Sequence, residues 1–335
     1  MTERTVPTFT GDAAGADLGP TLLHEHVFVR DPQLDRDLPH PEWDEEAAVE
    51  RAVAGFERLY GLGVRTVVDL TVPGLGRDVA LVRRVAEATR IRLVAATGYY
   101  TADVLPPSLR SHGPGRLVGG ADPLEDLFLR DIREGIAGTG IRAGMLKVVS
   151  EGEELPPDVQ RVFAAAAAAH FETGVPITTH SSGRGGLVQQ AFLDRHGVAP
   201  DRIVIGHAGD SGDLDYLRAL ADAGSSLGFD RFGMAHMGSD EQRIRTLLAL
   251  LEAGYRDRIV LSHDASFFSR VTPPSWRAAT APDWHMEHLH TGILPRLRAA
   301  GATDDDLAAM LVDTPRHLLA GGSAERTPAA SRVDA

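Results

Sequence analysis

Two histidines, His24 and His26, lie two residues apart in the apolar run Thr21-Leu-Leu-His24-Glu-His26-Val-Phe-Val29. In a β-strand, side chains two residues apart point to the same face, so both imidazoles would project together from one rigid element. A pair of neutral nitrogen donors in this arrangement suits a divalent metal such as zinc. Alone, a His-x-His pair in a strand is more often structural, so the metal interpretation depends on the rest of the chain.

Lys147 is the only lysine among the 34 basic residues, and it lies within the apolar run Ala143–Val149. A charge in such a strand is costly, which indicates chemistry that needs an amine and that a guanidinium cannot perform. A buried amine has a depressed pKa, and its neutral form reacts with carbon dioxide to give a carbamate, an anionic oxygen ligand able to bridge two metals. The structural alternative is a lysine that snorkels from a strand end.

Other candidate ligands stand at the ends of apolar runs. They occur in Ile-Thr-Thr-His180, Ile-Val-Ile-Gly-His207 and Ile-Val-Leu-Ser-His-Asp264. A catalytic zinc site usually has about three protein ligands, so four histidines, one aspartate and one lysine favour two metal ions. Two ions close together lower the pKa of a shared water and polarise a carbonyl or phosphoryl oxygen, and Asp264 could take the proton of that water.

These ligands require a scaffold that gathers several strand ends. The strand-like runs are Thr21–Val29, Val64–Leu70, Ile91–Thr97, Ala143–Val149, Val175–His180, Arg202–His207, Ser225–Asp230 and Arg258–Asp264. Helical periodicity lies between them, at Asp44–Tyr60, Asp78–Thr89, Pro123–Ala137, Pro157–Thr173, Gly186–His196, Leu214–Ala223 and Asp240–Ala253, and continues at Glu287–Ala300 and Asp304–Leu311. This alternation predicts an α/β fold of the (β/α)8 TIM-barrel type, whose active site is built at the carboxyl ends of the strands.

Two connections are longer than a barrel needs. They are Tyr100–Asp122 and Ala265–His285, and the second carries Phe267, Phe268, Trp276 and Trp284. Long loops of this kind often form lids or binding walls, although aromatic residues there can also pack on a neighbouring helix or subunit. We expect one barrel domain over residues 1–322 and a disordered tail at 323–335. The histidines at 285, 288 and 290 are expected to pack or to face solvent.

Composition narrows the range of partners. The chain has 47 acidic against 34 basic residues and a net charge of −13, which argues against nucleic acid and anionic membranes and favours a small-molecule substrate. Without cysteine it can have neither disulfides nor thiolate ligands. No long apolar run and no signal-peptide pattern is present, so we expect a cytoplasmic protein.

From about Gly19 to Leu319 the sequence resembles the phosphotriesterase family of the amidohydrolase superfamily. The resemblance is carried by Gly19-Pro-Thr-Leu-Leu-His24-Glu-His26, Lys147, Thr-His180, Gly-His207, Phe229-Asp-Arg231-Phe-Gly233 and Ser262-His-Asp264. It implies a binuclear centre in which His24, His26 and Asp264 hold the more buried ion, His180 and His207 hold the more exposed one, and carboxylated Lys147 bridges them. It also implies a homodimer. Zinc is favoured, and manganese, cobalt and iron stay open because the same ligands serve all of them.

Within that family, the sequence is more similar to the phosphotriesterase-like lactonases. Tyr100 matches the lactonase tyrosine over the metals, and Arg231 matches the arginine after strand seven. The resemblance therefore implies a lactonase acting on substrates such as N-acyl-homoserine lactones, with Tyr100, Arg231 and Asp264 as catalytic residues and a side activity on organophosphates. Tyr100, Arg231, Phe267, Phe268 and Trp276 would line the substrate pocket.

Three other functions stay open from the sequence. A primary phosphotriesterase would use the same centre on a tetrahedral phosphorus atom. A Schiff-base aldolase would use Lys147 as its nucleophile. A metal-stabilised barrel that only binds a ligand is the third, and the complete set of six ligands argues against it.

Overall fold

The computed structural model describes residues 5–321, so the tail predicted at 323–335 lies outside the described part of the chain. Its centre is a parallel sheet of nine strands in the order β10-β9-β8-β7-β6-β5-β4-β3-β11. The strands are β3 (Thr21–Val29), β4 (Thr66–Asp69), β5 (Arg92–Gly98), β6 (Ala143–Val149), β7 (Ile177–His180), β8 (Ile203–Ile205), β9 (Ser226–Phe229), β10 (Ile259–Leu261) and β11 (Ser266–Ser269).

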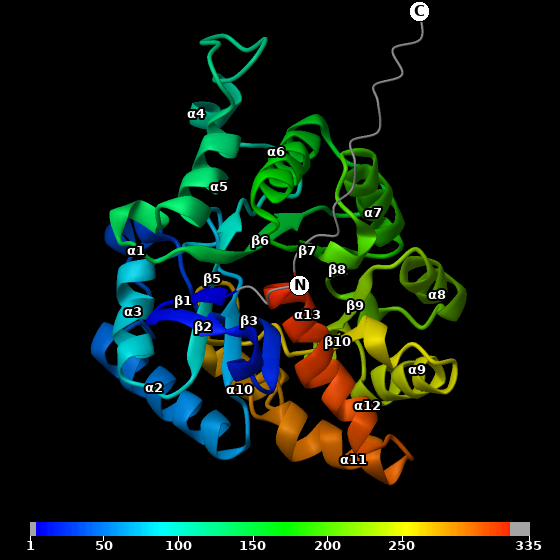
Figure 1. Cartoon of the computed structure of the whole chain (residues 1–335). Coiled ribbons are helices and arrows are strands. Elements are labelled where there is room, and N and C mark those ends of the chain that lie inside the picture. The colour runs from blue at the N-terminus through cyan, green and yellow to red at the C-terminus, as the bar shows by residue number, and fades with distance from the viewer. Residues whose placement is uncertain (1–4, 322–335) are drawn as a thin grey trace, which may run out of the picture.

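The sheet closes on itself between the segment after β10 and β3. The His24 N–H donates to Ser262 Oγ at 2.9 Å, and the Asp264 N–H donates to the His24 carbonyl at 3.1 Å. Helices surround the closed sheet as a ring (Figure 1). The predicted (β/α)8 barrel is therefore confirmed, and each predicted strand overlaps an observed one, with β5 extending one residue beyond its predicted end.

Seven long helices follow the barrel strands at the predicted places. They are α2 (Glu45–Gly61), α3 (Val79–Glu87), α5 (Pro123–Arg133), α6 (Pro157–Thr173), α7 (Gly185–Arg195), α8 (Leu214–Asp222) and α9 (Asp240–Glu252). Several begin at a side chain that accepts a backbone N–H of the first turn, as Asp44, Asp78 and Asp213 do. Such capping satisfies donors that the first helical turn leaves free.

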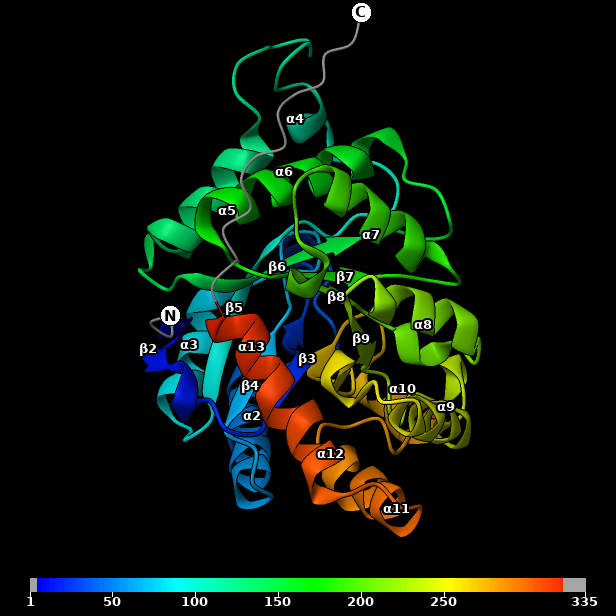
Figure 2. The same ribbon diagram turned by 45° about the vertical axis from the view of Figure 1, so that its right-hand side comes forward.

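The connections contain shorter elements. These are α1 (Pro32–Asp37), α4 (Pro107–Arg110), α10 (Pro274–Thr280), and the 3-10 turns Gly15–Asp17, Ile136–Gly138, Pro200–Arg202, Ala208–Asp210, Ala235–Met237 and Arg256–Arg258. The long connection after β5 carries α4 and stands off the barrel (Figure 2). None of the helices in residues 5–321 combines the length and the apolar character that a membrane span needs.

The amino end of the barrel is covered by the first and last elements of the described chain. The antiparallel strands β1 (Thr5–Thr8) and β2 (Gly11–Ala14) were not predicted, and β1 packs on β5 and β6. The carboxyl-terminal helices are α11 (Leu294–Ala299), α12 (Asp304–Ala308) and α13 (Thr314–Ala320), with π-helical turns at Leu289–Ile293 and Ala309–Asp313. Leu18, Leu318 and Leu319 close this end with apolar side chains, which leaves the opposite end for polar chemistry.

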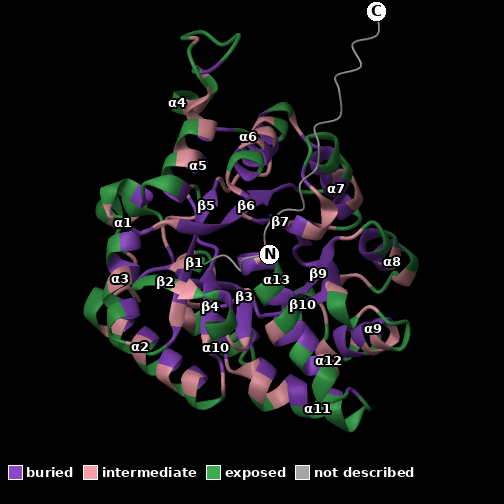
Figure 3. Ribbon diagram, viewed as in Figure 1, coloured by how far each residue is buried: buried purple, intermediate pink, exposed green. Residues whose placement is uncertain are grey.

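The barrel strands are largely buried (Figure 3), and the buried apolar residues form two clusters. Val68, Val94 and Val260 belong to the small inner cluster, whereas their neighbours on the same strands belong to the larger cluster between sheet and helices. This follows from the strand alternation, in which successive residues face opposite sides.

The predicted loop Ala265–His285 differs from expectation because it begins with a ninth strand, β11, paired in parallel with β3. Phe268 lies opposite Phe28 in this pairing and is fully buried beside Trp43, while Phe267 packs on Phe56 of α2. The two phenylalanines were expected in the substrate pocket. They instead join the core because the segment continues the barrel.

We expect Gly55→Ala to destabilise the protein. A Cβ at Gly55 of α2 would collide with the Phe267 ring, and overpacking of this kind costs about 1–3 kcal/mol, more than the roughly 1 kcal/mol of helix propensity gained. Gly61→Ala is the matched control, because a Cβ there meets nothing within 4 Å. Urea unfolding should place the midpoint of Gly55→Ala below the wild type and that of Gly61→Ala at or above it. Equal midpoints for both variants would contradict the packing of Phe267 on α2.

Candidate metal centre

The structure brings all six predicted ligands to the carboxyl end of the barrel. His24 and His26 lie on β3, Lys147 lies on β6, and His180 is the last residue of β7, whereas the other two follow β8 and β10. Parallel strands in a closed barrel deliver their carboxyl ends to one mouth, which explains why residues far apart in sequence meet there. The six residues are His24, His26, Lys147, His180, His207 and Asp264.

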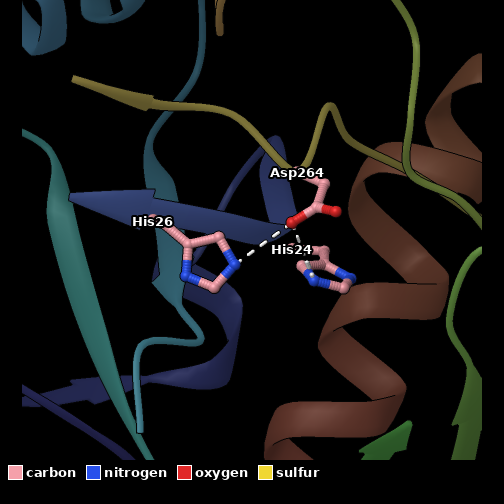
Figure 4. A group of neighbouring side chains, drawn as sticks. All are labelled: His24, His26 and Asp264. Carbon is pink, nitrogen blue, oxygen red and sulfur yellow. Dashed lines mark hydrogen bonds and ion pairs between the residues drawn. The ribbon is translucent and has the colours of Figure 1, made fainter. Parts of the chain in front are cut away.

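The first group consists of His24, His26 and Asp264, whose side chains approach one another in Figure 4. Asp264 Oδ1 lies 3.1 Å from His26 Nε2 and 3.4 Å from His24 Nε2. Burial alone would raise the pKa of Asp264. The positive potential of the nearby imidazoles and of the Arg231 guanidinium outweighs this effect and holds the pKa well below its usual value. Two imidazole nitrogens and an ionised carboxylate oxygen at such distances fit a divalent ion.

The second group consists of His180 and His207. His180 Nδ1 lies 2.9 Å from His207 Nε2, and burial lowers the pKa of both imidazoles, which favours their neutral, metal-binding forms. On the outer side of this pair, Glu151 lies 3.0 Å from His180 Nε2 and leaves Nδ1 to face inward. Sequence reasoning missed Glu151, since no spacing singled it out.

Lys147 lies between the two groups. Its Nζ is 3.2 Å from His24 Nε2 and 3.2 Å from the Thr179 carbonyl, and only 1% of the residue is exposed. Burial lowers the pKa of Lys147 to about 8, although the nearby carboxylates of Asp264 and Asp230 favour its charged form. Within residues 5–321 no carboxylate comes within ion-pair distance of this amine. A substantial part of the population is therefore neutral at mildly alkaline pH.

Asp230 connects the two groups, and sequence reasoning did not select it. Its Oδ2 lies 2.8 Å from His24 Nδ1, and its Oδ1 lies 2.9 Å from His207 Nδ1. Burial alone would raise the pKa of Asp230, but the two imidazoles lower it below its usual value. Because Asp230 holds Nδ1 of each ring, both Nε2 atoms are free to face a metal. The signal was available, since the seventh predicted strand ends on Asp230 as others end on ligands.

His24, His207 and Asp230 also lie close enough to be considered a metal site of their own. We assign them a different role, because the two Nδ1–H groups pointing at one carboxylate form ordinary hydrogen bonds. A metal-binding histidine commonly donates its second ring nitrogen to a carboxylate in this manner.

The structure places Arg231 and Tyr100 beside the predicted ligands. Arg231 Nε is 3.3 Å from Asp264 Oδ2, and its Nη1 donates to Asp210 Oδ2 at 2.9 Å. The other carboxylate oxygen of Asp210 accepts from the buried Arg243, so Asp210 is shared by two guanidiniums. The Tyr100 ring lies 5.8 Å from the His180 ring, and burial raises the pKa of Tyr100 to about 12.

A cavity of about 360 Å³ opens above the ligands. Its apolar wall includes Val29, Leu75, Met234, Met237, Val271 and Trp284, and both Tyr100 and Arg231 line it. Trp276 is not among the residues that line this cavity, but its ring lies 5.2 Å from the ring of His236, which does line it. Of the five predicted pocket residues, the cavity is thus lined by Tyr100 and Arg231, whereas Phe267 and Phe268 pack against the core and Trp276 lies on α10.

Two other polar features lie away from the ligands. A larger cavity of about 630 Å³ is lined by Arg30 and Arg77, but these cations are already paired, with Asp35 at 2.8 Å and with Asp131 at 2.7 Å. In the predicted histidine cluster, His288 Nε2 lies 2.7 Å from Asp240 Oδ2, and none of the three histidines lines the cavity above the ligands.

A TIM barrel that gathers imidazoles, carboxylates and a buried lysine at its mouth has the architecture of a metal-dependent hydrolase. The sequence model of the phosphotriesterase family matches residues 4–319. A solved structure of the phosphotriesterase from Mycobacterium tuberculosis shares 42% identity and a TM-score of 0.92, over 94% of this chain and 98% of that one. An aryldialkylphosphatase of Saccharolobus solfataricus is 36% identical over 90% of this chain and 94% of its own length.

A further solved structure comes from the engineering of organophosphate hydrolysis in a weak promiscuous lactonase. It is 35% identical, with a TM-score of 0.81, over 94% of this chain and 99% of that one. With the family match, these similarities show that the chain belongs to the phosphotriesterase family. It is accordingly a metal-dependent hydrolase.

We expect Asp230→Asn to weaken metal binding at both groups of ligands, because an amide nitrogen cannot accept the Nδ1–H that one carboxylate oxygen accepts now. Losses of about 10–100-fold in metal affinity are usual when such an outer partner is removed. Competition with a chelator, followed by elemental analysis, measures this. Asp131→Asn is the control, since Asp131 is a buried carboxylate that pairs with Arg77 and Thr97 away from the site. Equal metal retention by the two variants would contradict the role of Asp230.

Proposed function

We propose that this chain is a lactonase that hydrolyses lactones such as N-acyl-homoserine lactones and cleaves phosphotriesters as a side activity. The observation that carries the proposal is the placement of Tyr100 and Arg231 beside the ligands, under a cavity with an apolar wall. The similarity to a protein described as a weak promiscuous lactonase supports it.

The centre would hold two divalent ions, with zinc favoured and manganese, cobalt or iron as alternatives. His24, His26 and Asp264 would bind one ion, His180 and His207 the other, and Lys147 would bridge them as a carbamate. When bound, such ions lower the pKa of water and polarise a carbonyl oxygen. The buried amine between the two groups and its depressed pKa support the carbamate, since only the neutral amine combines with carbon dioxide.

The protein's own residues would bind and orient the lactone. Tyr100 keeps its proton at neutral pH, so its hydroxyl can donate a hydrogen bond to the lactone carbonyl or ring oxygen. Arg231 adds a fixed positive charge where negative charge develops. Asp264 is ionised and faces the cavity, so it can take a proton from water and return it to the leaving alkoxide. Water then adds across the ester bond, and the ring opens to a hydroxy acid.

The acyl chain would lie along the apolar wall of the cavity. Met234 and Met237 stand on one side, and both belong to the segment after β9 that also carries Arg231. Methionine side chains adapt to irregular apolar shapes, which suits acyl chains of varied length. The homodimer and the cytoplasmic location that the sequence suggested stay proposals beside this one.

A primary phosphotriesterase is the second candidate, since a relative with 36% identity is an aryldialkylphosphatase. The two are separated by kcat/KM of the metal-replete enzyme on a long-chain N-acyl-homoserine lactone and on a dialkyl aryl phosphate. We expect the lactone to be preferred. Tyr100→Phe should lower the lactone value by on the order of a hundredfold, as the removal of a positioned donor does in comparable sites. A preference for the phosphate would mean that the second candidate is correct.

We expect Lys147→Arg to abolish activity and to release one or both ions, although the positive charge is kept, because a guanidinium forms no carbamate. Metal analysis and activity after reconstitution measure this. In the wild type, reconstitution of metal-free protein with zinc and bicarbonate should become faster as the pH rises through about 8, where the Lys147 amine becomes neutral. A fully active Lys147→Arg variant would refute the carbamate.

A further inference from the structure

Glu25 lies on β3 between the predicted ligands His24 and His26, and its side chain takes the opposite side of the strand. It is fully buried and accepts three hydrogen bonds. Oε1 accepts from the His263 N–H at 2.9 Å and from His263 Nδ1 at 2.6 Å, while Oε2 accepts from the Ala265 N–H at 2.9 Å. The proton lies on Nδ1 because His263 Nε2 itself accepts from the Leu289 N–H at 2.8 Å.

These bonds surround Asp264, which stands between His263 and Ala265. Asp264 has a φ of 53°, a left-handed conformation that is costly for most L-residues and that aspartate adopts more readily than most. It lies in the irregular segment between β10 and β11. Its own N–H donates to the His24 carbonyl, and the His26 N–H donates to the Ala265 carbonyl at 2.8 Å. Three successive N–H groups, of residues 263, 264 and 265, are thus held by two adjacent residues of β3.

The same arrangement occurs at the second group of ligands. His207 also has a left-handed conformation, with a φ of 62°, and the buried Asp230 carboxylate accepts its N–H at 2.9 Å. Among residues 5–321, only one other non-glycine residue, Ala137, has a positive φ. Two of these three positions, His207 and Asp264, are predicted metal ligands. At His207, the Asp230 carboxylate accepts the N–H of the ligand itself. At Asp264, the Glu25 carboxylate accepts the N–H groups of both neighbouring residues.

We propose that Glu25 is a positioning residue for the metal centre, which holds the strained backbone around Asp264 so that its carboxylate faces His24 and His26 before a metal binds. The two faces of β3 then have different roles. His24 and His26 supply ligands from one face, and Glu25 on the other face holds the backbone on both sides of Asp264 by hydrogen bonds. A site held in this way loses less freedom when the ion enters, which raises its affinity. This inference rests on the proposed metal centre and is independent of the substrate.

The test is metal binding by Glu25→Gln. The amide has the same shape, but its nitrogen cannot accept, so one N–H beside Asp264 loses its partner. Asp158→Asn is the matched control, because Asp158 is a buried carboxylate that accepts the Leu105 N–H at 3.0 Å and pairs with Arg110 rather than with residues around Asp264. We expect Glu25→Gln to lose about 10–100-fold in affinity for zinc in chelator competition and to show a smaller zinc-induced rise in Tm. Asp158→Asn should lower the Tm of the metal-free protein but keep the full zinc-induced rise.

A second measurement uses the wild type and does not depend on whether the variant folds. In the metal-free protein, the amides of residues 263 and 265 should exchange slowly with deuterium, because Glu25 already holds them. Fast exchange that becomes slow only after zinc is added would show that the metal organises Asp264, and it would overturn the proposal. Zinc affinity of Glu25→Gln equal to that of the wild type would do the same. A wild type that binds two ions yet ignores lactones would refute the proposed substrate alone.

Discussion

The Asp230 carboxylate is the interaction on which the arrangement of the site depends, since its two oxygens hold one imidazole from each group of ligands. In a metal-binding histidine, a hydrogen bond from the second ring nitrogen usually fixes the position of the proton and the orientation of the ring. Asp230 does this for His24 and His207 together, so the two groups cannot move independently. Asp230 follows β9, so it reaches His207 after the neighbouring β8 and His24 on β3, which lies beyond β10 in the closed barrel.

The left-handed backbone at Asp264 lies where the barrel closes between β10 and β3. The segment after β10 must leave the regular ladder to aim the Asp264 side chain at the mouth, and it rejoins the sheet as β11. The hydrogen bonds that the ladder loses there are replaced by Glu25, Ser262 and the His24 carbonyl. Unpaired buried N–H groups would otherwise destabilise the barrel where its first and last strands meet.

Charged side chains of alternating sign form a row of ion pairs beside the predicted ligands. Asp264, Arg231, Asp210 and Arg243 follow one another, and Arg243 also donates to the Gly238 carbonyl at the start of α9. The segment between β9 and α9, which supplies Met234 and Met237 to the cavity, is thereby tied to the ligand Asp264. Under the proposed function, these pairs would connect substrate binding against this wall to the geometry of the predicted ligands.

The barrel, its strands and the six residues at its mouth could be predicted from the sequence. Apolar runs that end in His180, His207 and Asp264 are visible without coordinates, because strand periodicity and the polar residue that terminates it are local properties. Lys147 was recognisable by composition alone. Similarity to known proteins then supported the same family.

Only the tertiary structure decided which residues support those six. Glu25, Asp230, Asp210 and Glu151 form hydrogen bonds with residues 23 to 238 positions away. The strand pattern could single out Asp230 as a strand end, but no periodicity shows which residue it meets at such a separation. The same holds for Phe267 and Phe268, whose apolar character fits a lid and a core equally well. Their place was decided by the pairing of β11 with β3, because burial depends on which surface a segment meets and not on the segment itself.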